Sequence, residues 1–418
     1  MRPIRFASVL LLAVLLATGC NGAKAPSENL QGAASPQETK PPNTQPETPQ
    51  KPVPEDPIQK KLGSMTLEQK LGQMVMAGVD GTKMDEQAKS LIANEFIGGF
   101  ILYKPNIEST AQAAALLNEL KEANRGNPAP LLLSVDQEGG KVSRMPGTLV
   151  PTPASRDIAK TGDKEKARAI GKAIGAEVRA LGFNVDFAPV LDIDSNPNNP
   201  VIGNRSFGPT AAIVSSFGLQ QMEGLRSERV IPVVKHFPGH GDTSVDSHLE
   251  LPVVSKTLDQ LRKLELVPFA EAIRSEADMV MVAHILLPQL DPDHPSSMSP
   301  TVIGDLLRKE MGFGGVVITD DMTMGAILKH NDLGEAAVQS VKAGADIVLV
   351  AHEYAKAKMV IGALRQAVQS GAITADSIDR SVYRILELKE RYKLSDAASG
   401  PVNEKNLNDK LQKAVGSP

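Results

Sequence analysis

The feature that most constrains the fold of this chain is a series of eight short apolar runs that alternate with longer segments of helical periodicity. The runs lack a regular polar/apolar alternation, which is typical of strands buried on both faces of a parallel sheet. They cover residues 73–79, 98–103, 130–135, 184–191, 230–234, 278–283, 315–319 and 346–350. The helical patterns include 109–124, 164–181, 211–227, 258–274 and 334–343. Eight β–α alternations predict an α/β fold of the TIM type, a (β/α)8 barrel, with a doubly wound open sheet as the alternative.

The first 20 residues predict a targeting segment that is separate from the fold. A basic start is followed by an apolar stretch over 9–16, which is too short to span a bilayer by itself. It ends in Ala17-Thr18-Gly19-Cys20, which resembles the signal of a bacterial lipoprotein, whose cysteine is lipidated and becomes the mature N-terminus. Cys20 is the only cysteine among 418 residues, so the mature chain can form no internal disulfide. An ordinary secretory signal with an incidental cysteine is the alternative.

The next segment, 21–57, is rich in Pro, Gln, Glu and Thr and has few large apolar residues. Such a composition cannot bury a core and predicts a disordered tether. We therefore expect one folded catalytic domain over 58–394, held by a lipid anchor at the extracellular face of the cell membrane. The polar residues 395–418 predict a flexible C-terminal tail.

Composition narrows the choice of partners. The formal net charge of −4 gives no indication of nucleic-acid binding. Tryptophan is absent and aromatic residues make up only 3% of the chain, whereas long glycan-binding clefts need aromatic stacking platforms. We therefore expect a small ligand. We also expect no cofactor, no membrane contact beyond the lipid anchor, and a monomer.

Polar residues follow the predicted strands in regular register, at the carboxyl ends where a barrel gathers its active-site loops. In chain order they are Asp136–Arg144, Asp192 with Asp194 and Asn204–Phe207, Lys235 with His236, His284, Asp320 with Asp321, and His352 with Glu353. The segment 235–248, Lys-His-Phe-Pro-Gly-His-Gly-Asp-Thr-Ser-Val-Asp-Ser-His, holds three of the seven histidines. Its glycines and proline break the regular helical spacing of a metal motif, so we expect no catalytic metal.

Two carboxylates near one pocket suit sugar hydrolysis among other acid/base reactions. The segments 235–248, 136–144 and Ile318-Thr319-Asp320 resemble glycoside hydrolase family 3, and more closely its NagZ-type β-N-acetylhexosaminidase branch. The resemblance extends over about 62–388.

The resemblance implies a retaining mechanism through a covalent glycosyl-enzyme, with Asp320 as the nucleophile. Asp321 is expected to cap the helix that follows. In this branch the general acid/base is a histidine held by an aspartate two residues earlier, which matches His248 and Asp246. A carboxylate bonded to one ring nitrogen fixes the tautomer and leaves the other nitrogen for the leaving oxygen.

The remaining motif residues match positions that bind the non-reducing sugar. These are Asp136, Arg205, Lys235 and His236, together with Arg144 in a binding or structural role. Glu138 is expected to be structural and paired with Arg144. The sequence leaves the roles of Asp192, Asp194, His240 and His284 open, although His240 is a candidate for bonds within its own loop.

The resemblance thus implies an exo-β-N-acetylglucosaminidase that releases terminal GlcNAc from short peptidoglycan fragments. A β-glucosidase or β-xylosidase on the same scaffold, a β-N-acetylglucosaminide phosphorylase, and a lipid-anchored sugar-binding protein without activity are the alternatives. The 2-acetamido preference comes from the resemblance to the branch and from no particular residue.

Overall fold

The computed structural model describes residues 56–416. Cys20, the signal segment over 1–20 and nearly all of the predicted tether lie outside the described residues. Within the described part, no helix has the length and apolar character needed to cross a bilayer.

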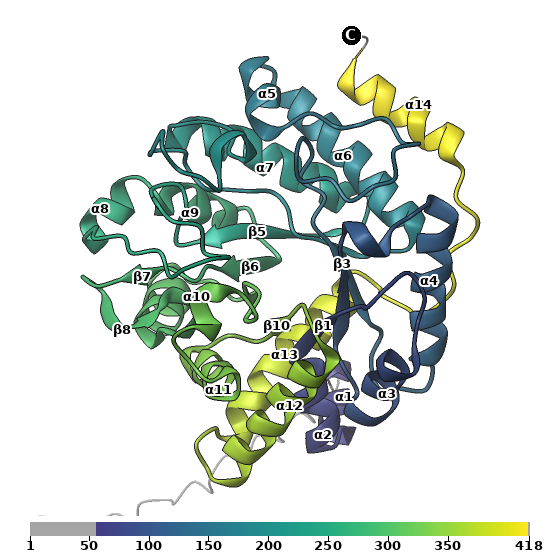
Figure 1. Cartoon of the computed structure of the whole chain (residues 1–418), viewed down its shortest axis with the longest axis vertical. Helices are drawn as coiled ribbons and strands as arrows, with labels where there is room; N and C mark the ends of the chain where they lie inside the picture. The colour runs from purple at the N-terminus through teal and green to yellow at the C-terminus, as the bar shows by residue number, and fades with distance from the viewer. Residues whose placement is uncertain (1–55, 417–418) are drawn as a thin grey trace, which may run out of the picture. The chain divides into compact units, whose positions relative to one another are not determined.

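Eight parallel strands form the centre of the fold, in the order β10-β1-β2-β3-β4-β5-β6-β9. A parallel bridge between Ile318 and Ile347 joins the two ends of this series. Figure 1 shows the strands surrounding the centre of the molecule and the helices forming an outer ring. The predicted (β/α)8 barrel is confirmed, because the strand order follows the chain and each strand pairs with its sequence neighbour.

Seven of the eight predicted apolar runs contain a whole barrel strand, whereas the strand that begins in the run 230–234 continues to Phe237. The strands are β1 (Val75–Gly78), β2 (Gly99–Leu102), β3 (Leu132–Val135), β4 (Val185–Asp186), β5 (Ile231–Phe237), β6 (Met279–Val282), β9 (Val316–Thr319) and β10 (Val348–Val350). A separate antiparallel hairpin, β7 (Leu286–Leu287) with β8 (Asp291–Pro295), follows β6. Every barrel-strand residue is buried, which explains why the runs show no alternation.

The α-helices are α1 (Pro57–Ser64), α2 (Leu67–Gln73), α3 (Glu86–Glu95), α4 (Thr110–Ala123), α5 (Ser155–Lys160), α6 (Lys164–Leu181), α7 (Ala211–Ser227), α8 (Leu258–Lys263), α9 (Leu266–Arg274), α10 (Gly325–Leu328), α11 (Leu333–Ala343), α12 (Tyr354–Gln369), α13 (Ala375–Arg391) and α14 (Glu404–Val415). Short 3-10 segments are η1 (Lys104–Asn106), η2 (Gly203–Arg205) and η3 (Ser296–Met298), and η4 (Pro300–Glu310) is a wider π-type helix.

Capping residues set the ends of several helices. The Asp163 side chain accepts from the backbone N–H groups of Glu165 and Lys166 at the start of α6, and Gly182 ends that helix in the left-handed conformation. The predicted helix over 258–274 is instead two helices, α8 and α9. Pro268 lacks a backbone N–H and is tolerated only in a first turn, so a new helix begins just before it.

The C-terminal segment differs from the prediction. Residues 404–415 form α14, which packs against α6 through buried Leu407 and Leu411 (Figure 1). The Asn403 side chain caps the helix by accepting from the Asn406 N–H. The prediction of a flexible tail over 395–418 was therefore wrong for this stretch, because two leucines four residues apart give an otherwise polar helix one apolar face.

Candidate active site

The predicted site residues converge on one cavity at the carboxyl ends of the strands. Its volume is about 280 Å³. The residues that line it include Tyr103, Asp136, Glu138, Arg144, Arg205, Lys235, His236, His240, Ser247, His248, Asp320, Asp321, Met324 and His352. The cavity lies near the lower end of the range of about 300 to 1,000 Å³ that is usual for ligand pockets, which fits a single sugar residue better than a long glycan.

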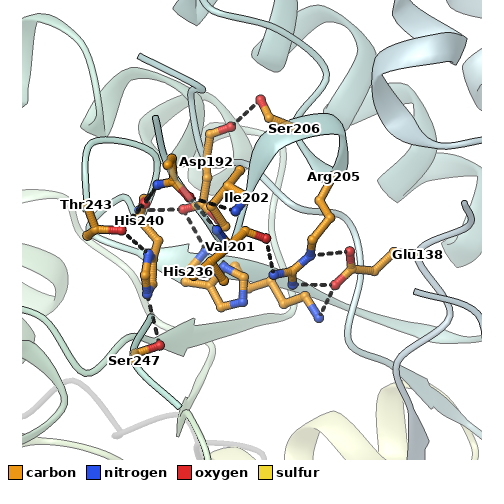
Figure 2. Close-up of polar contacts among 12 residues, drawn as sticks. Glu138, Asp192, Val201, Ile202, Arg205, Ser206, His236, His240, Thr243 and Ser247 are labelled. Atoms are coloured by element: carbon orange, nitrogen blue, oxygen red, sulfur yellow. Dashed lines mark hydrogen bonds and ion pairs between the residues drawn. The ribbon is translucent and has the colours of Figure 1, made fainter. Parts of the chain in front are cut away.

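A buried cluster of charges forms one wall of the cavity. The Arg205 guanidinium donates to both oxygens of Glu138, through Nε at 2.9 Å and Nη2 at 2.7 Å (Figure 2). Lys235 Nζ lies 2.8 Å from Glu138 Oε1 and 2.6 Å from Asp136 Oδ1. Arg144 lies farther from the cluster, with Nη2 4.0 Å from Asp136 Oδ2. The expected Glu138–Arg144 pair was wrong: Glu138 pairs with Arg205 and Lys235.

These pairs decide the ionisation of Glu138. Burial opposes its negative charge, but the adjacent Arg205 and Lys235 outweigh burial and hold the pKa of Glu138 below its usual value. Two cations therefore face two carboxylates, and the wall carries donors and acceptors in fixed positions. Such a wall can bind several hydroxyl groups at once.

Asp192 binds two histidines, His236 of β5 and His240 of the loop that follows this strand. Its Oδ2 lies 2.6 Å from Nδ1 of His236, and its Oδ1 accepts from the backbone N–H of His240 at 2.6 Å (Figure 2). Burial disfavours the Asp192 charge, yet His236 and His240 lower its pKa. An ionised Asp192 only accepts, so His236 must donate from Nδ1 and present Nε2 to the cavity.

His240 forms hydrogen bonds within its own loop, which is the role that the sequence suggested for it. Its Nδ1 lies 2.8 Å from Thr243 Oγ1, and its Nε2 lies 3.1 Å from Ser247 Oγ (Figure 2). Burial and the neighbouring His236 lower the pKa of His240 to about 4. This histidine is therefore neutral near pH 7 and serves to brace the loop.

The other residues whose roles were open stand behind the cavity. Asp194 pairs with Arg156 Nη2 at 2.7 Å. His284 is buried, with Nδ1 2.7 Å from Ser297 Oγ and Nε2 3.0 Å from the Asp321 carbonyl oxygen. Neither is among the described residues that line the cavity, so both act as supports.

Asp320 stands at the carboxyl end of β9. Its backbone N–H donates to the Val282 carbonyl oxygen at 2.9 Å, which fixes its position relative to β6, and its Oδ1 accepts from the Asp321 N–H at 2.9 Å. Burial would raise the pKa of Asp320, but His236 and His284 and then the Asp321 N–H lower it below its usual value. Asp320 is thus an ionised carboxylate on a rigid strand end.

Asp321 has a different role from the one expected. Its Oδ1 accepts from the N–H groups of Thr323 and Ala351, and its Oδ2 accepts from Thr323 Oγ1. The N-terminal cap of α10 is Met324. Asp321 therefore ties the loop after β9 to the end of β10 and does not cap a helix.

His248 and Asp246 form a hydrogen-bonded dyad. Nδ1 of His248 lies 2.8 Å from Asp246 Oδ1, which also accepts from the His248 backbone N–H at 2.9 Å. The His248 side chain is 65% exposed and lines the cavity at its rim. Burial would raise the pKa of Asp246, but bonds from the His248 backbone and ring lower it. The arrangement leaves Nε2 of His248 able to exchange a proton with a group bound above Asp320.

The comparisons with known proteins agree with this geometry. The profile of the Glycosyl hydrolase family 3 N terminal domain matches residues 66–388. This chain belongs to glycosyl hydrolase family 3. The predicted family is thereby confirmed, and the chain is a glycosidase.

Several relatives of this family 3 glycosidase carry a more specific name. Beta-hexosaminidase LpqI of Mycobacterium tuberculosis is 36% identical over 327 residues, covering 77% of this chain and 82% of the relative. Beta-hexosaminidase A of Pseudoalteromonas piscicida is 34% identical over 346 residues, but this chain spans only 58% of its length.

Among solved structures, a family 3 beta-N-acetylglucosaminidase from Paenibacillus sp. str. FPU-7 is 43% identical. It superposes with a TM-score of 0.80, covering 84% of this chain and 68% of the other.

The family 3 site also contains Tyr103, which the sequence did not single out, and His352, which the sequence placed at a strand end without a role. Tyr103 follows β2 and His352 follows β10; their rings stack with centroids 5.4 Å apart, and the Arg144 guanidinium lies 5.9 Å from the Tyr103 centroid. Nε2 of His352 is 3.9 Å from Asp321 Oδ2. Burial and then the charges of Asp321 and Asp136 raise the pKa of Tyr103, which therefore keeps its donor proton. Their position directly after strands was the available signal.

Replacing Glu138 by Gln tests the charged wall of this family 3 enzyme. We expect a loss of roughly 3 kcal/mol in the free energy of unfolding at pH 7, because buried Arg205 would lose its counter-charge and buried Lys235 would keep only Asp136. Chemical denaturation measures this loss. The matched control is Glu310→Gln, which removes an exposed bidentate pair with Arg262 and should change stability far less. Equal effects of the two variants would contradict the assignment.

The ionised Glu138 also determines how the stability of the fold depends on pH. Because the folded pKa of Glu138 lies below the usual value of 4.5, the stabilisation is fully present above pH 4.5. It is lost progressively as the pH falls below that value. The stability gap between wild type and Glu138→Gln should therefore narrow on acidification, as measured by denaturation at several pH values.

Proposed function

We propose that the protein is a retaining exo-β-N-acetylglucosaminidase that removes a terminal GlcNAc residue from short peptidoglycan fragments. The observation that carries the proposal is the ionised Asp320 within the same cavity as the His248–Asp246 dyad. The names of the beta-hexosaminidase relatives and of the Paenibacillus beta-N-acetylglucosaminidase support the choice of sugar.

In the first step, an oxygen of Asp320 attacks the anomeric carbon as the bond to the leaving oxygen breaks. The protonated His248 donates its Nε2 proton to that oxygen and becomes neutral, retaining its Nδ1–H bond to Asp246. The products of this step are a glycosyl ester on Asp320 and a free alcohol.

In the second step, Nε2 of His248 accepts a proton from water while the water oxygen attacks the anomeric carbon. The ester bond to Asp320 breaks and its carboxylate is regenerated, while His248 returns to the protonated form. Two inversions retain the β configuration. One histidine thus serves as acid and then as base, and Asp246 stabilises its cationic form.

The buried wall would hold the non-reducing sugar. Asp136 accepts from sugar hydroxyls, Arg205 and Lys235 donate, His236 presents Nε2 to them, and Arg144 adds a further donor at the cavity edge. Burial of the charged pairs fixes their geometry before the sugar binds, which favours catalysis by positioning. The single-sugar volume of the cavity and the absence of Trp support an exo-acting enzyme on short fragments.

The activity test compares 4-nitrophenyl β-GlcNAc with 4-nitrophenyl β-glucoside. The proposal expects turnover of the first at a kcat/KM at least about 100-fold higher, since a polar substituent that pairs with the site discriminates strongly. Equal turnover would assign a β-glucosidase. Phosphate-dependent formation of GlcNAc 1-phosphate would assign a phosphorylase. Binding of GlcNAc without turnover would leave only a sugar-binding protein.

We also propose that the protein is anchored by lipid on Cys20 at the extracellular face of the cell membrane. The segment that ends in Ala17-Thr18-Gly19-Cys20 supports this proposal, and the distance provided by residues 21–57 would suit a membrane-tethered enzyme. Cys20→Ala should move the protein from the membrane fraction to the medium or soluble fraction, as measured by fractionation and immunoblotting. A variant that stays in the membrane fraction would contradict lipidation.

A further inference from the structure

Most of the exposed large apolar side chains gather beside the proposed acid/base. Within residues 56–416 there are five such side chains. Four of them, Val245, Leu249, Val253 and Leu328, lie on the segment that carries His248 or on the adjacent helix α10. Leu249, the residue directly after His248, is 66% exposed. The fifth, Met359, lies on α12 in the outer ring.

The two apolar-bearing elements form one unit. The N–H groups of Gly325 and Ala326 donate to the carbonyl oxygens of His248 and Ser247, each at 3.1 Å. A Cβ at position 325 would lie only 2.7 Å from the His248 carbonyl oxygen, so the close approach requires glycine.

Ion pairs reinforce the same connection. Glu250 Oε2 lies 2.9 Å from Lys329 Nζ, and Glu250 Oε1 lies 2.8 Å from His330 Nε2. Leu249 precedes this glutamate and Leu328 precedes this lysine. The charged residues that follow the two leucines in the sequence are thus paired with one another, while the leucine side chains remain exposed.

The position of this apolar surface indicates which part of a substrate would contact it. The cavity accommodates about one sugar, so the rest of a substrate must extend beyond its rim. In a glycoside the leaving oxygen must lie next to the acid, and His248 is at the rim. The first atoms of the leaving group therefore lie beside residue 249. An exposed apolar surface on a protein marks a binding site more often than scattered single residues do.

We propose that Leu249 and Leu328 form a leaving-group subsite that recognises the apolar surface of the group attached to the terminal sugar. The proposal rests on the proposed function and specifies its substrate class: glycosides whose leaving group presents alkyl or ring C–H surface next to the scissile oxygen. Hydrophobic contact with this surface lowers the barrier of the first step only, because the leaving group departs before water attacks.

Methyl and hexyl β-GlcNAc test this proposal, because their leaving alcohols have similar acidity and differ in apolar surface. We expect wild type to cleave the hexyl glycoside with a kcat/KM about fivefold or more above that of the methyl glycoside. Leu249→Ser and Leu328→Ser should each reduce this ratio towards one. Met359→Ser, an equally apolar-to-polar surface change, should keep the wild-type ratio.

Other results would overturn the proposal in distinguishable ways. An unchanged hexyl-to-methyl ratio in both leucine variants would overturn the subsite while leaving the proposed function intact. If, in addition, these variants lost binding to phosphatidylglycerol vesicles, the surface would be a membrane contact. No turnover of any β-GlcNAc glycoside by wild type would overturn the proposed function and the subsite together.

Discussion

Asp320→Ala should lower kcat for 4-nitrophenyl β-GlcNAc by on the order of 10⁴-fold, because it removes the proposed nucleophile. The fold should persist, since the only hydrogen bond that the Asp320 carboxylate accepts among the described residues comes from the Asp321 N–H. Steady-state kinetics measures the loss in kcat, and thermal unfolding checks that the variant is folded.

Azide makes the test specific to a nucleophile. In Asp320→Ala a small anion can enter the vacated space and attack the anomeric carbon directly, so added azide should restore turnover and give the α-glycosyl azide. Asp321→Ala is the matched control, because it removes the neighbouring carboxylate that braces the loop. Azide rescue of Asp321→Ala and not of Asp320→Ala would show that Asp321 is the nucleophile and would contradict our mechanism.

His248→Ala should give the second large effect, and its size should depend on the leaving group. A 4-nitrophenolate ion departs without much help, so we expect a loss of less than about tenfold in kcat/KM for that substrate. An alkoxide needs a proton as it leaves, and methyl β-GlcNAc should lose roughly 10² to 10⁴-fold. Asp246→Ala should show the same dependence with a smaller amplitude, because it leaves the imidazole in place.

A second His–Asp pair provides the control for this prediction. His294 and Asp291 lie 3.3 Å apart, and His294 is partly exposed like His248, but neither residue lines the cavity. His294→Ala should keep both substrates near wild-type rates. A loss in His248→Ala that is equal for the two leaving groups would show that this histidine does not protonate the leaving oxygen.

The barrel could be predicted because its strands are buried on both faces. Continuous apolar runs such as 230–234 can be recognised without knowing which strands they pair with, and their number and alternation with helices specify the topology. The helix α14 was missed because only Leu407 and Leu411 of its residues are buried. A short amphipathic pattern in a polar tail has too few apolar positions to distinguish it from a coil.

The sequence predicts which residues belong to the site better than it predicts which side chains pair with one another. Asp136, Lys235, His236, His248 and Asp320 lie at or after the carboxyl ends of strands and therefore meet at one end of the barrel. Which charges pair depends on side-chain reach across loops. Glu138 and Arg205 are 67 residues apart, and no spacing rule relates them.

The stacked pair of Tyr103 and His352 is another contact that the sequence does not predict. Tyr103 follows β2 and His352 follows β10, near opposite ends of the sequence. They stack because closure of the barrel places β10 next to β1, so that only β1 separates it from β2. A tyrosine or histidine directly after a buried strand can be selected from the sequence, but its contact with another strand end requires the structure.

The most direct test of the mechanism is to trap its intermediate. A 5-fluoro-β-N-acetylglucosaminyl fluoride forms the glycosyl-enzyme quickly and releases it slowly. After proteolysis, mass spectrometry should find the added sugar mass on the peptide that contains Asp320, in wild type and not in Asp320→Ala. A wild-type enzyme that turns over 4-nitrophenyl β-GlcNAc yet carries the label on another residue, or carries none, would contradict a retaining mechanism through Asp320.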